Sequence, residues 1–344
     1  MPDKFSKLKV AAVQAAPVFL NREASTEKAC KLIREAGKNG AKIIVFPEGF
    51  IPTHPVWYHF HPGTGKIATG LSVELFKNSV EIPSAEIDEL CKAASDAESY
   101  VIMGICEKMP KTTGTMYNTQ VYIGPDGKYI GKHQKIMPTV GERFVHKGGN
   151  GDTFGTFDTE YGPISALMCS ENSNPLAVFA LTAEGTRIHG AAWPNHWGKM
   201  IKSMKKYVEI ASLNFAQVSK AFVISACSTV DEDMIEKMRL AEDEKELLRK
   251  PEVSGGSMIV SPDAEIIAGP MSNEEGILYA DIDLEQCVVH KLHHDFSGNY
   301  NRPDIFNLFI NKDNPQLYYK VGRKEISTAE ALTAFNKSEI DEEE

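Results

Sequence analysis

Short apolar runs alternate with amphipathic stretches in the N-terminal part of the chain. Residues 9–16 and 42–46 are apolar and have the length of strands, and residues 23–38 between them place apolar side chains on one face and charges on the other. The continuous apolar run at 42–46 is typical of a strand that is buried on both faces. A strand, a helix and a second strand in this order predict a layered α/β fold.

The same alternation continues up to residue 282. We expect further helices over residues 84–97, 176–185 and 200–219, and strands over residues 100–106, 115–123, 162–168, 188–193, 221–226, 257–260, 265–268 and 276–282. Turn sequences at 124–128 and 261–264 are typical of hairpins between neighbouring strands. The order of elements predicts one α/β domain in which two mixed β-sheets pack face to face with helices outside, a four-layer αββα sandwich.

Three segments do not follow the regular pattern. Residues 54–70 are rich in aromatic residues, histidine, proline and glycine, and we interpret them as a loop that could form the wall of a pocket. Residues 231–250 are dense in charge and compatible with a helix, which suggests an exposed insertion or an element between subunits. The domain is expected to span residues 1–304, and residues 305–344 are expected to form an extended or partly disordered C-terminal tail, because they lack an apolar period.

The overall composition is that of an acidic globular protein. Of the 344 residues, 42% are hydrophobic and 24% are charged, and the net charge is −10 without a basic stripe. This charge makes nucleic acids and anionic membranes poor partners. We find no signal sequence and no apolar stretch of the roughly 18 residues that a membrane span needs. We therefore expect a cytoplasmic protein whose six scattered cysteines are reduced.

Cys169 lies between the predicted strand at 162–168 and a predicted helix. Asn174 is suited to the N-cap position of that helix, and Pro175 to its first helical position. The cysteine is therefore expected on a tight elbow, where the positive end of the helix would favour the thiolate. A plain buried cysteine is the alternative, and the choice between the two depends on which other groups lie nearby.

Two other reactive side chains occupy comparable positions. Glu48 follows the apolar run at 42–46, where a carboxylate is costly unless it is paired or functional. Lys135 follows the predicted hairpin at 115–132. A cysteine nucleophile, a carboxylate base and an ammonium group that stabilises negative charge together indicate covalent hydrolysis without a metal. The three histidines within 54–70 have no accompanying ligand spacing, so we predict no metal site.

Four short motifs stand in the order and spacing of a known family. They are Phe46-Pro47-Glu48, His133-x-Lys135-x-x-Pro138-Thr139 with Glu142-Arg143, Cys169-x-Glu171 with Pro175, and Gly298-x-Tyr300-x-Arg302-Pro303-Asp304. With these motifs, residues 8–304 resemble the nitrilase branch of the carbon–nitrogen hydrolase superfamily. One such motif would be weak support, whereas four in the right order are specific.

The resemblance implies an αββα sandwich, a Glu48–Lys135–Cys169 triad supported by Glu142, and no cofactor. It also implies a homodimer that assembles into a larger, often spiral, homo-oligomer. The substrate would be a small-molecule nitrile, which is hydrolysed to a carboxylic acid and ammonia through a cysteine thioimidate. Many nitrilases have tryptophan where this chain has Ser170, which leaves the substrate range open. Candidate substrate-binding residues are Ser170, through its backbone N–H, and, by loop position, Trp57, Tyr58, Trp193 and His196.

Two related activities and one unrelated role stay open at this point. An amidase or N-carbamoyl hydrolase would use the same triad on a substrate that is already an amide, and a nitrile or cyanide hydratase would stop at the amide. A non-catalytic binding or scaffold protein on the same fold is the third alternative. The run from His133 to Arg143 and the Arg302-Pro303-Asp304 segment favour the nitrile.

Overall fold

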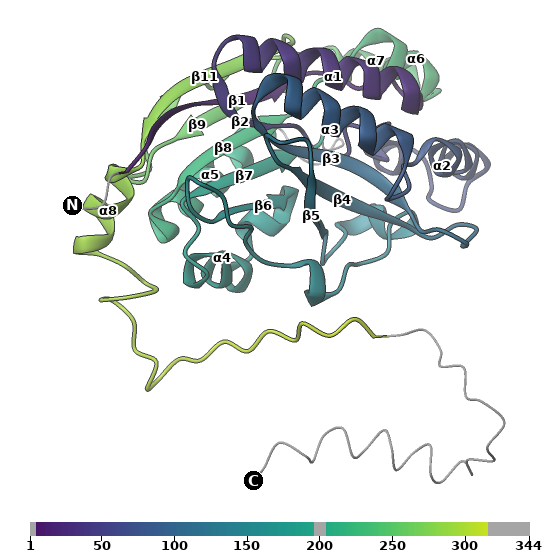
Figure 1. Ribbon diagram of the computed structural model, residues 1–344. Helices are drawn as coiled ribbons and strands as arrows, with labels where there is room; N and C mark the ends of the chain where they lie inside the picture. Colours follow the sequence, from purple (N-terminus) through teal and green to yellow (C-terminus); the bar gives the residue numbers. More distant parts are fainter. Residues whose placement is uncertain (1–4, 196–203, 316–344) are drawn as a thin grey trace, which may run out of the picture. The chain divides into compact units, whose positions relative to one another are not determined.

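The computed structural model describes residues 5–195 and 204–315, and the structural statements that follow concern these residues. The described residues up to Lys312 belong to one compact unit. Two β-sheets form the centre of this unit, and helices lie over their outer faces (Figure 1).

The first sheet has six strands in the order β11-β1-β2-β3-β4-β5. These strands are β1 (Lys7–Gln14), β2 (Ala41–Val45), β3 (Tyr100–Lys108), β4 (Met116–Ile123), β5 (Tyr129–Gln134) and β11 (Gly276–Asp283). The first three strands are parallel, because helical connections return the chain to the same edge of the sheet, whereas β4, β5 and β11 pair antiparallel with their neighbours. The hairpin β4–β5 confirms the predicted turn at 124–128.

The second sheet has five strands in the order β10-β9-β8-β7-β6. These strands are β6 (Ile164–Met168), β7 (Ile188–Trp193), β8 (Phe222–Cys227), β9 (Met258–Val260) and β10 (Ile266–Ala268). The first three are parallel and are joined through helices, and β9 and β10 form the predicted hairpin.

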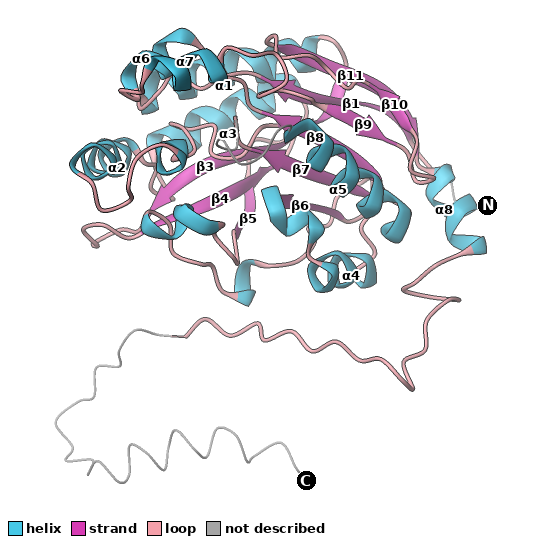
Figure 2. Ribbon diagram, turned by 180° about the vertical axis from the view of Figure 1, so that it is seen from behind, coloured by secondary structure: helices cyan, strands magenta, loops and turns pink. Residues whose placement is uncertain are grey.

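Apolar side chains fill the spaces between four layers. Helices α1 (Arg22–Lys38) and α3 (Ala85–Ala97) pack on the outer face of the first sheet, and helices α4 (Pro175–Ala183) and α5 (Met204–Ser219) pack on the outer face of the second (Figures 1 and 2). The inner faces of the sheets pack on each other through a separate cluster that includes Ile43, Ile102, Ile188 and Ile224. The predicted αββα sandwich is therefore confirmed.

The predicted loop at 54–70 is only partly a loop. A 3-10 helix, η1 (Val56–His59), lies inside it, and its last residues begin helix α2 (Lys66–Asn78), which the sequence interpretation overlooked. Helix α8 (Glu285–His293) was also overlooked. The buried residues of α2, Ala68, Leu71 and Leu75, have helical spacing, so this signal was present and was missed, whereas α8 buries Cys287 alone and gives a weak signal.

The charged segment at 231–250 forms two helices, α6 (Glu232–Lys237) and α7 (Glu242–Leu248). It is helical, as expected, but it is not simply an exposed insertion. Met234 and Met238 are fully buried in an apolar cluster that also contains Trp57. Charges line the outer side of these helices, while their apolar side chains contribute to the core. None of the helices in the described ranges combines the length and the apolar character needed to cross a membrane.

Candidate active site

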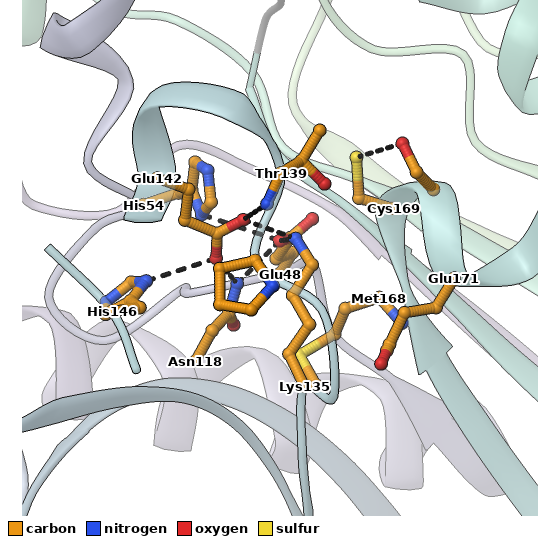
Figure 3. A network of polar contacts seen from close by, with 12 residues as sticks. Glu48, His54, Asn118, Lys135, Thr139, Glu142, His146, Met168, Cys169 and Glu171 are labelled. Carbon is orange, nitrogen blue, oxygen red and sulfur yellow. Dashed lines mark hydrogen bonds and ion pairs between the residues drawn. The ribbon is translucent and has the colours of Figure 1, made fainter. Parts of the chain in front are cut away.

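Three segments that follow strands bring two charged side chains and a cysteine together. Glu48 comes shortly after β2, Lys135 directly after β5, and Cys169 directly after β6. Figure 3 shows these three side chains converging from their separate segments. Gly104 of β3 makes this possible for Glu48, because a Cβ atom there would clash with the carbonyl oxygen of Pro47.

Lys135 links two buried carboxylates. Its Nζ lies 2.7 Å from Oε1 of Glu48 and 2.7 Å from Oε2 of Glu142, and the three side chains are at most 1% exposed. Glu142 lies in the short 3-10 helix η2 (Val140–Phe144), and its Oε2 also accepts the N–H of Thr139 at 2.8 Å. Buried charges of this kind persist only when most of their oxygens and protons find partners.

Further polar side chains surround the two carboxylates. Nδ2 of Asn118 donates to Oε1 of Glu48 at 2.6 Å and to Oε1 of Glu142 at 2.8 Å. Nδ1 of His146 lies 3.1 Å from Oε1 of Glu142, and Nδ1 of His54 lies 3.5 Å from Oε1 of Glu48. Asn118 and His146 therefore hydrogen-bond the carboxylates in addition to Lys135, whereas Nδ1 of His54 makes no hydrogen bond among the described residues (Figure 3).

Cys169 has an unusual backbone conformation. Its φ is +50°, at the point where β6 passes into the 3-10 helix η4 (Cys169–Ser173), and its side chain is buried. A residue other than glycine adopts this conformation only when its surroundings impose it. Glu171 contributes to this, because its carboxylate accepts the N–H groups of Met168 at 3.1 Å and of Ile136 at 2.7 Å. These two hydrogen bonds hold the turn at Cys169 to the end of β6 and to the segment that follows β5.

The elbow differs from the predicted one in its electrostatics. Asn174 is confirmed as the N-cap of α4, with its Oδ1 accepting the N–H of Leu176 at 3.0 Å. Helix α4 begins at Pro175, however, so η4 separates Cys169 from the helix N-terminus. Burial and the nearby charge of Glu48 raise the pKa of Cys169 to about 12. The prediction that this setting favours the thiolate is therefore wrong, and the resting thiol needs a base to become a nucleophile.

Burial and the shared lysine move the pKa values of the two carboxyl groups apart. Burial raises the pKa of Glu48 to about 7, against the opposing effect of Lys135. Burial also acts on Glu142, but the Lys135 ammonium and the hydrogen bond from His146 outweigh it and hold that pKa well below its usual range. A carboxyl group that titrates near neutrality can accept a proton, whereas one that stays ionised balances the charge of Lys135.

Three of the predicted substrate-binding residues lie close to this group. The hydroxyl of Tyr58 lies 3.0 Å from Nε2 of His54. Oγ of Ser170, an exposed residue, lies 3.7 Å from Sγ of Cys169. Trp193 contributes its backbone, since its carbonyl oxygen accepts the N–H of Glu48 at 3.3 Å, while its ring is buried in the core.

The two remaining predicted pocket residues are Trp57 and His196. The ring of Trp57 is fully buried and packs edge-on against Phe19, and its indole N–H donates to Ser72 at 3.4 Å. The structure therefore places this ring in the hydrophobic core rather than among the charged side chains. His196 lies outside the described residues.

One set of side chains has spacing that would suit a cation. Ligand atoms of Glu48, His54 and Glu142 lie within 4.8 Å of one another. The ammonium group of Lys135 already lies 2.7 Å from an oxygen of each carboxylate, so a metal ion would have to displace it. We therefore do not assign these residues as metal ligands.

Several residues of the site were overlooked in the sequence. Nδ2 of Asn172 donates to the carbonyl oxygens of Leu167 at 3.2 Å and of Cys169 at 3.0 Å, which also holds the elbow. Asn118 and His146 lie outside the four motifs. A signal for Asn118 did exist, because a polar residue in the middle of a buried strand is costly unless it is hydrogen-bonded.

Comparison with known proteins identifies the family of the chain. The sequence profile of the carbon–nitrogen hydrolase family matches residues 9–291. A nitrilase of Bacillus sp. (strain OxB-1) is 32% identical over 342 residues, which cover 98% of each chain. An arylacetonitrilase of Aspergillus kawachii is 33% identical and covers 89% of this chain and 92% of its own length. An aliphatic nitrilase of Sinorhizobium fredii is 33% identical, with coverages of 90% and 97%.

Solved structures share the fold at lower identity. A carbon–nitrogen hydrolase from Helicobacter pylori G27 gives a TM-score of 0.67 at 18% identity, over 87% of this chain and 97% of that chain. The chain belongs to the carbon–nitrogen hydrolase family, a family of hydrolases that act on carbon–nitrogen bonds. Within the family it belongs to the nitrilase branch.

Proposed function

We propose that the chain is a nitrilase, which hydrolyses an organic nitrile to a carboxylic acid and ammonia. The observation that carries this proposal is the convergence of a buried thiol, a carboxyl group with a pKa of about 7 and a buried ammonium group at Cys169, Glu48 and Lys135. The names of the relatives favour a nitrile over an amide, and two of them specify arylacetonitriles or aliphatic nitriles.

In the proposed reaction, Glu48 accepts the proton of the Cys169 thiol, and the thiolate attacks the nitrile carbon to form a C–S bond. The nitrile nitrogen takes the proton from Glu48, which gives a thioimidate. A water molecule deprotonated by Glu48 adds to the same carbon, and Glu48 passes that proton to the nitrogen. The added hydroxyl group then gives its own proton to the nitrogen as the C–N bond breaks, so ammonia leaves and a thioester remains. A second water molecule cleaves the C–S bond, releases the acid and restores the thiol. One nitrile and two waters thus give one acid and one ammonia.

Lys135 and Glu142 have supporting roles in this proposal. The ammonium group of Lys135 stabilises the negative charge that develops on the attacked group. Glu142 stays ionised, keeps Lys135 charged and fixes its position through a contact of 2.7 Å. Ser170 lies beside the nucleophile, with its Oγ 3.7 Å from Sγ of Cys169, where its backbone N–H is proposed to stabilise the developing charge.

A nitrile and its matching amide separate the two closest activities. We expect the enzyme to release ammonia from phenylacetonitrile or a short aliphatic nitrile at least ten times faster than from the corresponding amide. The thiolate adds directly to the nitrile carbon, and the carboxylic acid should be the main product. A coupled ammonia assay and chromatography of the products measure both. Turnover of the amide without turnover of any nitrile would show an amidase, and accumulation of the amide would show a hydratase.

The pH dependence tests the role of Glu48. We expect kcat/KM to fall about tenfold for each pH unit below pH 7. Glu48 must be ionised to accept the thiol proton, and since burial raises its pKa to about 7, lowering the pH protonates the base and removes activity. Initial rates between pH 5 and pH 9 measure the profile, and circular dichroism at pH 5 controls for acid unfolding. A rate that stays constant from pH 8 down to pH 5 would contradict the assignment of Glu48 as base.

We also propose that the chain works as a homo-oligomer. Leu176 of α4 and Tyr207 and Ile210 of α5 are more than half exposed, on the helices that cover the second sheet. Exposed apolar side chains grouped in this way support a protein–protein interface. A cytoplasmic location stays a prediction.

A further inference from the structure

Asn118 lies at the centre of the candidate site but has no part in the reaction described above. It lies within β4, where its backbone carbonyl oxygen accepts the N–H of Lys135 at 2.8 Å. Its Nδ2 donates to one oxygen of Glu48 at 2.6 Å and to one oxygen of Glu142 at 2.8 Å (Figure 3). A single fully buried residue thus contacts all three members of the ion cluster.

Charge fixes the orientation of the Asn118 amide. Two carboxylate oxygens lie within hydrogen-bond distance of the same amide atom, so this atom must be the NH₂ group. A flipped amide would direct Oδ1 at two negative charges. Oδ1 is buried and has no hydrogen-bond partner among the described residues, which is unfavourable. The side chain is therefore held in place by its contacts with the two carboxylates.

The two carboxylate oxygens of Glu48 differ in their hydrogen-bond partners. Oε1 accepts hydrogen bonds from Lys135 and Asn118 and lies 3.5 Å from Nδ1 of His54. Oε2 is buried and has no hydrogen-bond partner among the described residues. Oε2 is therefore the oxygen that can receive a proton from a further group, and the side chain of Cys169 is directed into the same site (Figure 3).

We propose that Asn118 is a positioning residue, which holds the carboxylates of Glu48 and Glu142 around Lys135 and leaves Oε2 of Glu48 free to take the proton of Cys169. This inference rests on the proposed function, because it concerns the activation of the same thiol. The titratable groups that face Glu48, or contact those that do, are Lys135, Glu142, His54, Cys169, Cys106, Tyr58, His59 and His146.

Removing the hydrogen-bond donor of Asn118 is expected to raise the pKa of Glu48. The hydrogen bond from Nδ2 stabilises the ionised form of Glu48 more than the protonated form. Without it, Glu48 takes up a proton at higher pH, and the base is lost earlier as the pH falls. A residue with a purely structural role would change the amount of folded enzyme but not the pH at which the base is lost.

The test uses two variants and a matched control. Asn118→Leu keeps a similar volume without a donor, and Asn118→Asp keeps the shape and replaces the amide with a carboxyl group. Gln120→Leu removes a buried amide on the same strand that makes no hydrogen bond to the carboxylates. Circular dichroism and thermal unfolding show which proteins are folded. The first readout is the pH profile of kcat/KM with a nitrile, and the second is the pH profile of Cys169 alkylation by iodoacetamide, followed by peptide mass spectrometry.

For both Asn118 variants, we expect kcat/KM at pH 7.5 to fall about 10- to 100-fold and the acid limb of both profiles to move up by about one pH unit. Gln120→Leu should keep the wild-type limb. An unchanged acid limb in folded Asn118→Leu or Asn118→Asp would overturn the inference. If the wild type hydrolyses no nitrile, the proposed function fails on its own, and the alkylation profiles still decide the role of Asn118, because alkylation needs no nitrile.

Discussion

Replacing Cys169 with alanine is expected to lower ammonia release from a nitrile by about 10⁴-fold or more while the fold is retained. The substitution removes the sulfur that forms the C–S bond, so neither the thioimidate nor the thioester can form. Losses of this size are typical when the nucleophile of a covalent mechanism is removed. Alanine differs from cysteine only by the loss of the sulfur atom, and it adds neither charge nor volume, so the folded state should persist. Initial rates with the best nitrile of a panel measure the loss.

Cys227 provides the matched control for this experiment. It is buried in the same apolar cluster as Cys169, and burial also raises its pKa to about 12. The two thiols therefore differ in their neighbours, because Glu48 and Lys135 act on Cys169. Cys227→Ala should keep activity within a few fold of the wild type. Near-normal turnover by Cys169→Ala would show that the reaction does not pass through this sulfur.

Replacing Lys135 with methionine is expected to affect both activity and stability. The substitution leaves two carboxylates buried together without their cation, and breaking a buried pair in this way costs about 3–5 kcal/mol. It also removes the charge that stabilises the attacked group, so kcat should fall by about 10³-fold or more. Denaturant unfolding measures the first effect, and initial rates at high nitrile concentration measure the second.

The variant Lys132→Met separates the expected loss of stability from the expected loss of kcat. Lys132 lies in β5, the strand that leads to Lys135. It forms an ion pair with Glu107, whose side chain is 2% exposed. This variant should lose stability as well, since it also leaves a buried carboxylate without its partner, but it should keep its kcat. If Lys135→Met lost stability and retained kcat like Lys132→Met, Lys135 would be a structural residue only.

The sequence predicted the fold well where hydrophobic patterning is strong. The apolar run at 42–46 and the amphipathic residues 23–38 became β2 and α1, because burial on one or both faces leaves a clear period. Helix α8 was overlooked because it buries Cys287 alone, and α2 because its first residues were interpreted as part of the loop at 54–70, although its buried residues have helical spacing. The prediction for the charged segment at 231–250 relied on its many charged residues, which lie on its outer side. It gave too little weight to Met234 and Met238, which are buried in the core.

The candidate site was predicted as far as its residues lie in short motifs. The structure brings together Glu48, the pair Lys135 and Glu142 from one motif, and Cys169, which come from three separate stretches of the chain. The state of the thiol could not be predicted, because the pKa of Cys169 depends on its burial and on the charge of Glu48, which only the fold determines. Partners such as Asn118 were overlooked for a similar reason, since a hydrogen bond across a sheet leaves no local pattern.

The most direct test of the account is the identity of the residue that carries the substrate carbon during turnover. The enzyme is mixed with saturating nitrile, quenched with acid in the steady state, and digested for peptide mass spectrometry. The account predicts the acyl or imidoyl group of the substrate on the peptide that contains Cys169 and on none of the peptides with the other five cysteines. Continued turnover with Cys169 unmodified and the substrate group on another residue would contradict it.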